Sequence, residues 1–136
     1  MASQMKLSIV TPEKKFYVGD VTEINTRTQA GCIGILAQHI PFVGMVVPTK
    51  TSFKLADGTE KVAFTSTGLI KVTKTEVEML VDASEWPEEI DIRRAKEAKE
   101  RAEERLAKDK QTGKTDTDRA EIALQRAMAR LKIKKS

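Results

Sequence analysis

The sequence predicts an α+β protein, with an antiparallel β-sandwich of about ten strands in residues 1–84 and an antiparallel two-helix hairpin in residues 85–136. Three observations support this division. Apolar and polar residues alternate at period two up to about Asp82, which is typical of half-buried strands. Residues 85–136 hold 27 of the 44 charged side chains. That polar part also repeats one thirteen-residue helical pattern.

Turn residues divide the N-terminal part into short strands. Gly19 and Asp20 are expected to separate the second strand from the third, and Asp57-Gly58 is the strongest hairpin signal in the chain. Strands this short and evenly spaced favour a sandwich or flattened barrel with apolar inner faces. The expected strands cover residues 7–10, 15–18, 21–26, 32–36, 42–47, 52–55, 61–64, 69–72 and 77–81.

The first helix is expected to start at Pro87 and to run to about Lys108. Proline suits the first turn of a helix because its fixed φ matches the helix and its missing N–H is not needed there. Glu88, Glu89 and Asp91 would place acids at the positive end of the helix dipole.

A polar turn is expected over residues 110–117, and any of residues 115–117 would cap the second helix. Gly113-Lys114-Thr115 in this turn matches only the end of a phosphate-binding loop. The motif needs a glycine at position 108, which is lysine, and no strand precedes it. We therefore predict no phosphate loop here.

The repeated pattern is R-A-x-x-A-x-x-R-A-x-x-R-L, found at residues 94–106 and again at 119–131. At about 100° per residue, the alanines and leucine of each copy form one stripe and the arginines form a second stripe beside it. Helices that pack through the alanine stripes would carry both arginine stripes on the same side of the hairpin. Such a seam buries little apolar area, so the hairpin is expected to be marginally stable and to adopt more than one arrangement. The stripe arginines are Arg94, Arg101, Arg105, Arg119, Arg126 and Arg130.

The arginine stripes are a candidate anion site, because the arginine fork binds phosphate oxygens in a bidentate manner. A solvated helix face is the alternative interpretation. Asp91 lies one turn before Arg94 and would either hold that arginine or accept a hydrogen bond from the amino group of a ligand. The sequence shows no nucleophile triad and no metal-ligand spacing, and His39, the only histidine, is expected in a loop or an interface. We therefore predict no enzymatic activity.

Cysteine content and hydropathy indicate the compartment. The single Cys32 excludes an intrachain disulfide and fits a reducing environment. No apolar run approaches the roughly 18 residues of a membrane-spanning helix, and the N-terminal residues do not read as a signal peptide. A location in the cytosol, or on the cytosolic side of a larger structure, is expected.

Three stretches carry a resemblance to a known family. Residues 34–41, Gly-Ile-Leu-Ala-Gln-His-Ile-Pro, are similar to a GIL-P-G-HIP stretch of the epsilon subunits of bacterial F-type ATP synthases. Residues 90–95, Ile-Asp-Ile-Arg-Arg-Ala, fit the ATP-binding signature I/L-D-x-x-R-A of the bacillus-type members. Residues 119–131 resemble the second helix of those proteins. The resemblance covers nearly the whole chain.

This resemblance implies a non-catalytic rotor subunit of the proton-translocating enzyme, peripheral on the cytoplasmic face of the bacterial plasma membrane. The sandwich would join the gamma subunit to the c ring. A segment that reads Gly-Glu-Leu-Gly in the family is Gly31-Cys32-Ile33-Gly34 here, so an acid is missing near the ring, and Ala37-Gln38 replaces a Pro-Gly. The implied ring and stalk contacts are Gly31, Cys32, Ile33 and His39.

The resemblance also implies that the hairpin is a regulatory element. A compact form, docked on the sandwich, would bind ATP as a regulatory ligand that is not hydrolysed, with the role of Mg²⁺ left open. The nucleotide contacts carried over from the family are Glu85, Ile90, Asp91, Arg94, Ala95, Arg101, Arg126 and Arg130. An extended form would contact the alpha and beta subunits and inhibit ATP hydrolysis through Arg126, Arg130, Lys132, Lys134 and Lys135.

Two other functions fit parts of the sequence. The chain could be a stand-alone nucleotide sensor without a rotor partner. Its basic tail could instead bind nucleic acid, but one Trp, one Tyr and four Phe provide little base stacking, and the acidic first helix would repel phosphate. Co-purification with ATPase subunits and retention under moderate salt separate these functions.

Overall fold

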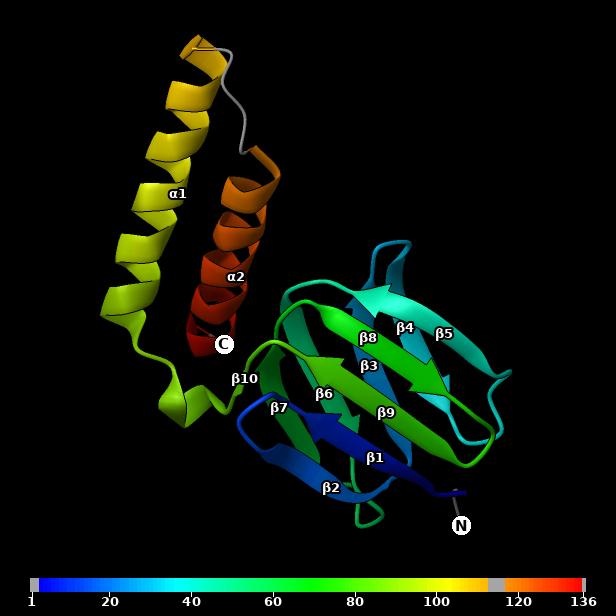
Figure 1. Ribbon diagram of the computed structural model, residues 1–136. Helices are drawn as coiled ribbons and strands as arrows, with labels where there is room; N and C mark the ends of the chain where they lie inside the picture. Colours follow the sequence, from blue (N-terminus) through cyan, green and yellow to red (C-terminus); the bar gives the residue numbers. More distant parts are fainter. Residues whose placement is uncertain (1–2, 113–116, 136) are drawn as a thin grey trace.

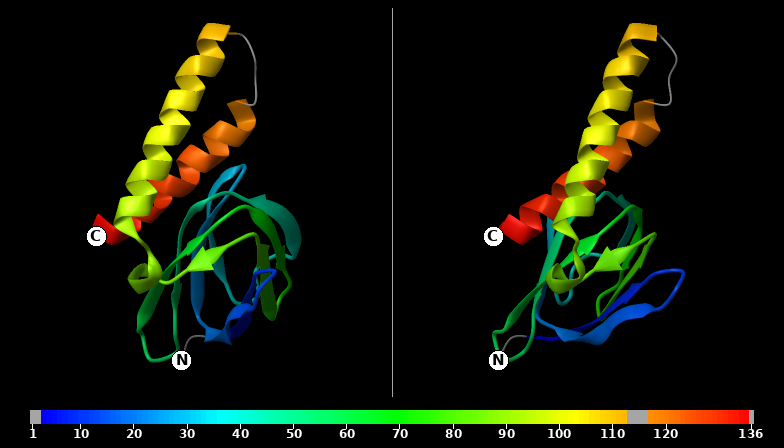
Figure 2. Two further views of the ribbon diagram at one scale, coloured as in Figure 1. Left: turned by 60° about the vertical axis from the view of Figure 1, so that its left-hand side comes forward. Right: turned by 90° about the vertical axis from the view of Figure 1, so that its left-hand side faces the viewer.

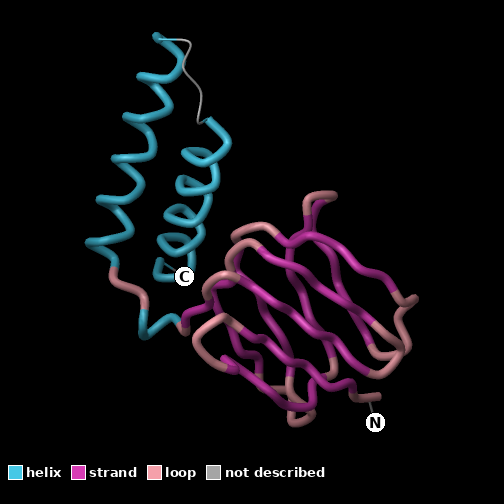
Figure 3. Tube along the Cα trace, in the orientation of Figure 1, coloured by secondary structure: helices cyan, strands magenta, loops and turns pink. Residues whose placement is uncertain are grey.

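The computed structural model describes residues 3–112 and 117–135, with the strands and the helices in separate parts of the molecule (Figure 3). The strands are β1 (Met5–Val10), β2 (Lys15–Val21), β3 (Glu23–Thr28), β4 (Gly31–Leu36), β5 (Phe42–Val46), β6 (Thr49–Lys54), β7 (Glu60–Thr65), β8 (Gly68–Val72), β9 (Glu76–Val81) and β10 (Ser84–Glu85). The helices are the 3₁₀-helix η1 (Pro87–Glu89), α1 (Ile92–Thr112) and α2 (Thr117–Lys135).

The ten strands form one continuous sheet in the order β10-β7-β6-β3-β5-β8-β9-β1-β2, and β4 lies off this path, paired with β3. The sheet folds into two layers, and β5, β8, β9, β1 and β2 make the layer nearer the viewer in Figure 1. The prediction of a ten-strand sandwich is confirmed. One pair differs from an all-antiparallel arrangement, because β1 runs parallel to β9.

The main core lies inside the sandwich, between residues 5 and 81. Burial alternates along the strands, as period two requires: in β9, Val77, Met79 and Val81 are buried and the residues between them are exposed. Phe53 and Ile24 are among the side chains of this core that are almost completely shielded from water. The apolar positions of the N-terminal part therefore fold largely among themselves.

The predicted break at Gly19-Asp20 is wrong. Both residues belong to β2, where they pair with Leu7 and Lys6 of β1, and the chain turns at Thr22 instead. The Thr22 N–H donates to the carbonyl of Lys54, which directs the chain toward the other layer. Pairing with a neighbouring strand therefore overrides the weak strand propensity of Gly and Asp.

The predicted helix start at Pro87 is also wrong. Pro87 opens the short η1, after which Ile90 is extended (φ −76°, ψ 123°). This extended residue buries its side chain against Phe64 and Ile133. The helix α1 starts only at Ile92, and it extends beyond the expected end at Lys108. The predicted boundary after Ser84 falls inside β10.

The hairpin packs through the alanine stripes that the repeat predicted. Ala95 and Ala102 of α1 and Ala120 and Ala127 of α2 are buried. The α2 helix contacts β6 and β7, and the far end of the hairpin projects away from the sandwich (Figure 2). The turn predicted over residues 110–117 is too long, because α1 continues to Thr112 and α2 already begins at Thr117. Residues 113–116, with two of the three candidate caps, lie outside the described residues. No helix among the described residues is long and apolar enough to cross a membrane.

Candidate functional site

A cavity of about 350 Å³ lies at the foot of the hairpin, next to the segment that joins the hairpin to the sandwich. Its size is within the range of small-molecule sites. The lining comes from β10 and the linker (Glu85, Glu89 and Asp91), from α1 (Arg94, Ala95, Glu97, Ala98 and Arg101) and from α2 (Arg130).

The start of α1 positions one wall of the cavity. Asp91 caps the helix, because its Oδ1 accepts a hydrogen bond from the backbone N–H of Arg94 at 3.2 Å. Arg94 and Arg101 are seven residues apart, so two helical turns place them on the same face of α1. Ala95 and Ala98 have small side chains, which leave room between the arginines and the linker.

The opposite wall comes from the C-terminal part of α2. Nε of Arg130 donates to Oε1 of Glu85 at 2.5 Å, and the Arg130 guanidinium carbon lies 4.3 Å from the centre of the Phe64 ring. The Arg130 side chain is 26% exposed, so this ion pair is partly shielded from solvent. The contact joins α2 to both β10 and β7.

The four acids of the lining all have partners other than the guanidinium groups of Arg94 and Arg101. The carboxylates of Glu85, Glu89, Asp91 and Glu97 accept hydrogen bonds from Nε of Arg130, the Trp86 N–H, the Arg94 N–H and Nε of Arg93, respectively. Among the described residues, neither the Arg94 guanidinium nor the Arg101 guanidinium has a hydrogen bond or an ion pair. The cavity therefore contains two unpaired cationic donor groups, which suits an anionic ligand.

The structure brings most of the expected nucleotide contacts together. Glu85, Asp91, Arg94, Ala95, Arg101 and Arg130 all line the cavity. Ile90 does not line it, because its side chain is buried in the small cluster with Phe64 and Ile133. Arg126 does not line it either; its Nε is shielded from solvent and has no partner among the described residues.

Sequence reasoning missed three lining residues, Glu89, Glu97 and Ala98. Ala98 belongs to the repeated pattern and follows Ala95 by three residues, so helical spacing gave a signal for it. Glu89 and Glu97 gave none, because acids on an exposed helix start or helix face are common.

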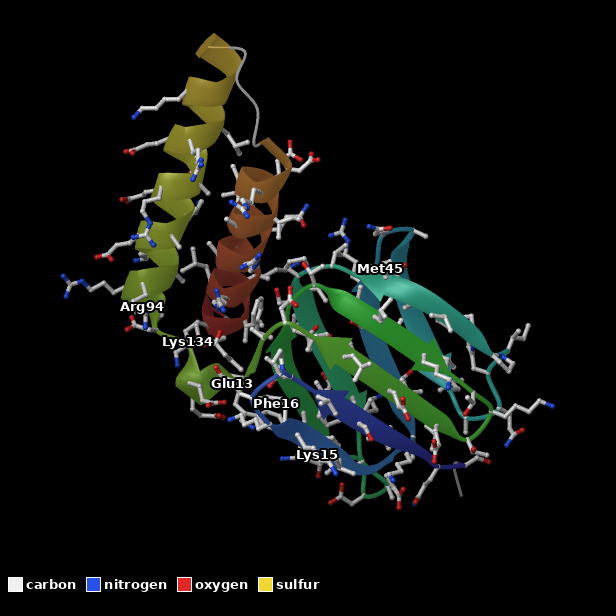
Figure 4. All side chains as sticks on the ribbon, viewed as in Figure 1. Glu13, Lys15, Phe16, Met45, Arg94 and Lys134 are labelled. Atoms are coloured by element: carbon white, nitrogen blue, oxygen red, sulfur yellow. The ribbon has the colours of Figure 1, made fainter. Side chains whose placement is uncertain are left out.

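The basic end of α2 is attached to the linker in this arrangement. Nζ of Lys134 donates to the carbonyl of Pro87 at 2.8 Å, and Figure 4 shows Lys134 and Arg94 at the same end of the hairpin. Lys132 is exposed, and the side chain of Lys135 lies outside the described residues. Arg130 and Lys134 therefore already have partners on the sandwich side.

Comparisons with known proteins agree with this architecture. A model of the β-sandwich domain of the ATP synthase delta/epsilon chain matches residues 4–87, and a model of the long α-helix domain of the same chain matches residues 88–135.

The chain belongs to the ATP synthase delta/epsilon family.

Relatives within the delta/epsilon family are close. The chain is 50% identical to the ATP synthase epsilon chain of Clostridium novyi over 98% of its own length and 99% of that protein. It is 58% identical to the epsilon chain of Clostridium acetobutylicum, over 78% of its own length and 80% of that protein. The fold resembles a chain in the Euglena gracilis mitochondrial ATP synthase assembly of OSCP, F1 and c-ring, with a TM-score of 0.79 and 24% identity, covering 95% of this chain and 80% of that one.

The residues expected at ring and stalk contacts lie at two ends of one strand of this delta/epsilon fold. Gly31, with φ 124°, is the first residue of β4, and Cys32 follows it with its side chain exposed. Ile33 is half-buried against the main core. His39 lies beyond the other end of β4, where its Nδ1 is 2.8 Å from the carbonyl of Ile40. The contacts therefore do not form one cluster.

An apolar surface, made by Val43, Met45, Leu69 and Leu80, covers the outer face of one sheet layer. Met45 pairs with Leu69, and Leu69 pairs with Leu80, so these three side chains form a row across β5, β8 and β9. Their exposed fractions range from 41% for Met45 to 68% for Val43. The strands on which α2 mainly packs, β6 and β7, belong to the other layer. Exposed apolar surfaces of this kind typically mark protein interfaces.

Proposed function

We propose that this chain is a non-catalytic central-stalk (rotor) subunit of a bacterial proton-translocating ATP synthase, peripheral on the cytoplasmic face of the membrane. In this proposal the sandwich joins the gamma subunit to the c ring, and the hairpin regulates ATP hydrolysis. The Clostridium relatives named ATP synthase epsilon chain support it over the whole chain length. The Euglena gracilis assembly, which contains F1 and the c-ring, provides the matching architectural context.

The apolar surface of Val43, Met45, Leu69 and Leu80 supports a protein partner for the sandwich. Leaving these side chains in water costs free energy, at about 25 cal/mol per Å² of apolar area. A partner in the stalk that covers them would recover it. Because α2 packs mainly on β6 and β7, in the other layer, such a partner would bind without displacing the hairpin.

The observation that carries the regulatory proposal is the pair of unpaired guanidinium groups, Arg94 and Arg101, that share a cavity with Arg130. Three arginines provide bidentate donors for phosphate oxygens. The carboxylates at the same cavity, including Asp91 beside Arg94, are acceptors for the amino group of a base. The residues therefore fit ATP as a ligand of the compact form.

The attachment of the hairpin supports a second, extended form. The apolar contact between the hairpin and the sandwich is the small cluster of Phe64, Ile90 and Ile133, which is separate from the main core. Releasing α2 would therefore leave the sandwich core intact. In the extended form, Arg126, Arg130 and the lysines that follow would contact the alpha and beta subunits and block hydrolysis. ATP, which binds the compact form, would shift the population toward it.

A titration of the full chain with ATP, ADP and GTP, followed by NMR of the arginine Nε–H groups, tests the ligand. We expect the Arg94 and Arg101 signals to shift with a nucleotide and to saturate. Signals that move only with ionic strength would contradict a specific site. Co-purification with gamma and c subunits tests the stalk assignment separately, and a chain recovered without either subunit would favour a stand-alone sensor.

A further inference from the structure

Phe64 lies between the sandwich and the hairpin. Its neighbour Ala63 belongs to the main core, so alternation along β7 turns the Phe64 side chain to the outer face of the sheet. The side chain is nevertheless 0% exposed, because Ile90 and Ile133 pack over it. An aromatic ring on the outside of the sandwich is therefore part of the surface on which α2 docks.

Strand register places a carboxylate beside this ring. Phe64 pairs with Glu85 of β10 on one side and with Lys50 of β6 on the other. Directly opposed residues of antiparallel strands have their side chains on the same face, about 5 Å apart at Cβ. The register therefore presents Glu85 next to the ring, on the face that α2 covers.

Arg130 uses both groups of this surface. Its Nε–H donates to Glu85, and its guanidinium carbon lies over the Phe64 ring, 4.3 Å from the ring centre. These two contacts together hold the guanidinium in place. Its two terminal nitrogens make no hydrogen bond within the described residues, and Arg130 lines the cavity. The sandwich thus orients a donor group of the hairpin.

We propose that Phe64 is a positioning residue for the ligand site, whose ring holds the Arg130 guanidinium so that the terminal nitrogens serve an anion in the cavity. This inference rests on the proposed binding of ATP by the compact form. Phe64 lies in a strand and does not line the cavity, but its ring would still affect ligand affinity. A cation–π contact of this kind corresponds to roughly 3- to 30-fold in affinity.

The test uses the full chain with Phe64→Leu, which keeps most of the apolar volume and removes the ring. Phe53→Leu is the matched control, because it removes an equally buried ring from the main core. We expect Phe64→Leu to weaken ATP binding roughly 3- to 30-fold and Phe53→Leu to leave the affinity of the folded chain unchanged. In an Arg130→Ala background, Phe64→Leu should cause no further loss.

Hydrogen exchange of the amides of residues 129–133 reports docking of α2 independently of ATP, and we expect Phe64→Leu to keep their protection. An unchanged affinity in Phe64→Leu, an equal loss in the Arg130→Ala background, or lost protection would each overturn the positioning role. A wild-type chain that binds no ATP overturns the proposed function instead. In that case the inference, which rests on the proposed function, falls with it, whereas failure of the Phe64→Leu test in a chain that binds ATP overturns the inference alone.

Discussion

Asp91 combines two roles in one carboxylate, and substitutions can separate them. Its Oδ1 caps α1 through the Arg94 N–H, and the same carboxylate lines the cavity. Within the described residues, the bond to the Arg94 N–H is the side-chain hydrogen bond that the Asp91 carboxylate makes. A contribution of the carboxylate to ligand binding must therefore appear as a change in ligand affinity in a variant that keeps the cap.

We expect Asp91→Ala to destabilise the hairpin by about 1 kcal/mol, the usual cost of losing an N-cap. Asp91→Asn should keep most of that stability, because the amide oxygen can also accept the N–H of Arg94. Thermal unfolding followed by helical circular dichroism measures this difference. If Asp91→Asn is as destabilising as Asp91→Ala, the carboxylate charge rather than the cap stabilises the start of α1.

Arg101 allows a clean comparison along one helix. Arg101→Ala should weaken ATP binding by about 1.5–3 kcal/mol, the cost of losing a hydrogen bond to a charged group. Arg105→Ala is the matched control, because Arg105 is exposed one turn further on and does not line the cavity. Calorimetric titration of both variants provides the test. Equal losses would mean that general positive charge, rather than the cavity, binds the nucleotide.

At the scale of elements, α2 is held to the sandwich mainly at its C-terminal end. Ile133 is buried in the small cluster, Arg130 pairs with Glu85, and Lys134 donates to Pro87. The other end of α2 packs against α1. The docked state therefore depends on a few contacts within about one helical turn.

Ile133→Ala should weaken docking of α2 by about 2–5 kcal/mol, as is usual when a buried isoleucine is truncated. Met128→Ala, at a position that is 51% exposed on the same helix, should have little effect. Hydrogen-exchange protection of the Glu89 and Ile90 amides, which donate to the carbonyls of Trp86 and Pro87, reports the docked population. Full protection in Ile133→Ala would show that the polar contacts alone hold the helix.

The local patterns of the sequence predicted the elements better than their contacts. Period-two alternation predicted the strands, and the repeat predicted the alanine seam and the arginines that share the cavity. The parallel pairing of β1 with β9, the extended Ile90 and the Phe64 ring under Arg130 were not predictable. Each depends on residues far apart in the chain. Glu85 and Arg130, for example, are separated by 45 positions in the sequence. Local propensity contains no information about such contacts.

At the scale of the whole molecule, ATP binding to the compact form and inhibition by the extended form would compete for the same side chains. Arg130 and Lys134 have partners on the sandwich side in the compact form. They cannot contact the catalytic head at the same time. A ligand shifts the equilibrium between the two forms by as much as its affinities for them differ.

Removal of the chain after Thr117 should therefore raise ATP hydrolysis by the assembled complex, by about fivefold or more if the coupling is of ordinary size. Assembly should be unaffected, because the apolar surface of Val43, Met45, Leu69 and Leu80 lies on the sandwich. Hydrolysis measured against ATP concentration should show relief of inhibition in the intact complex and none in the truncated one. The Asp91→Ala complex, whose compact form is weakened, should need more ATP for the same relief. An unchanged rate after truncation would mean that hydrolysis is restrained by another part of the enzyme.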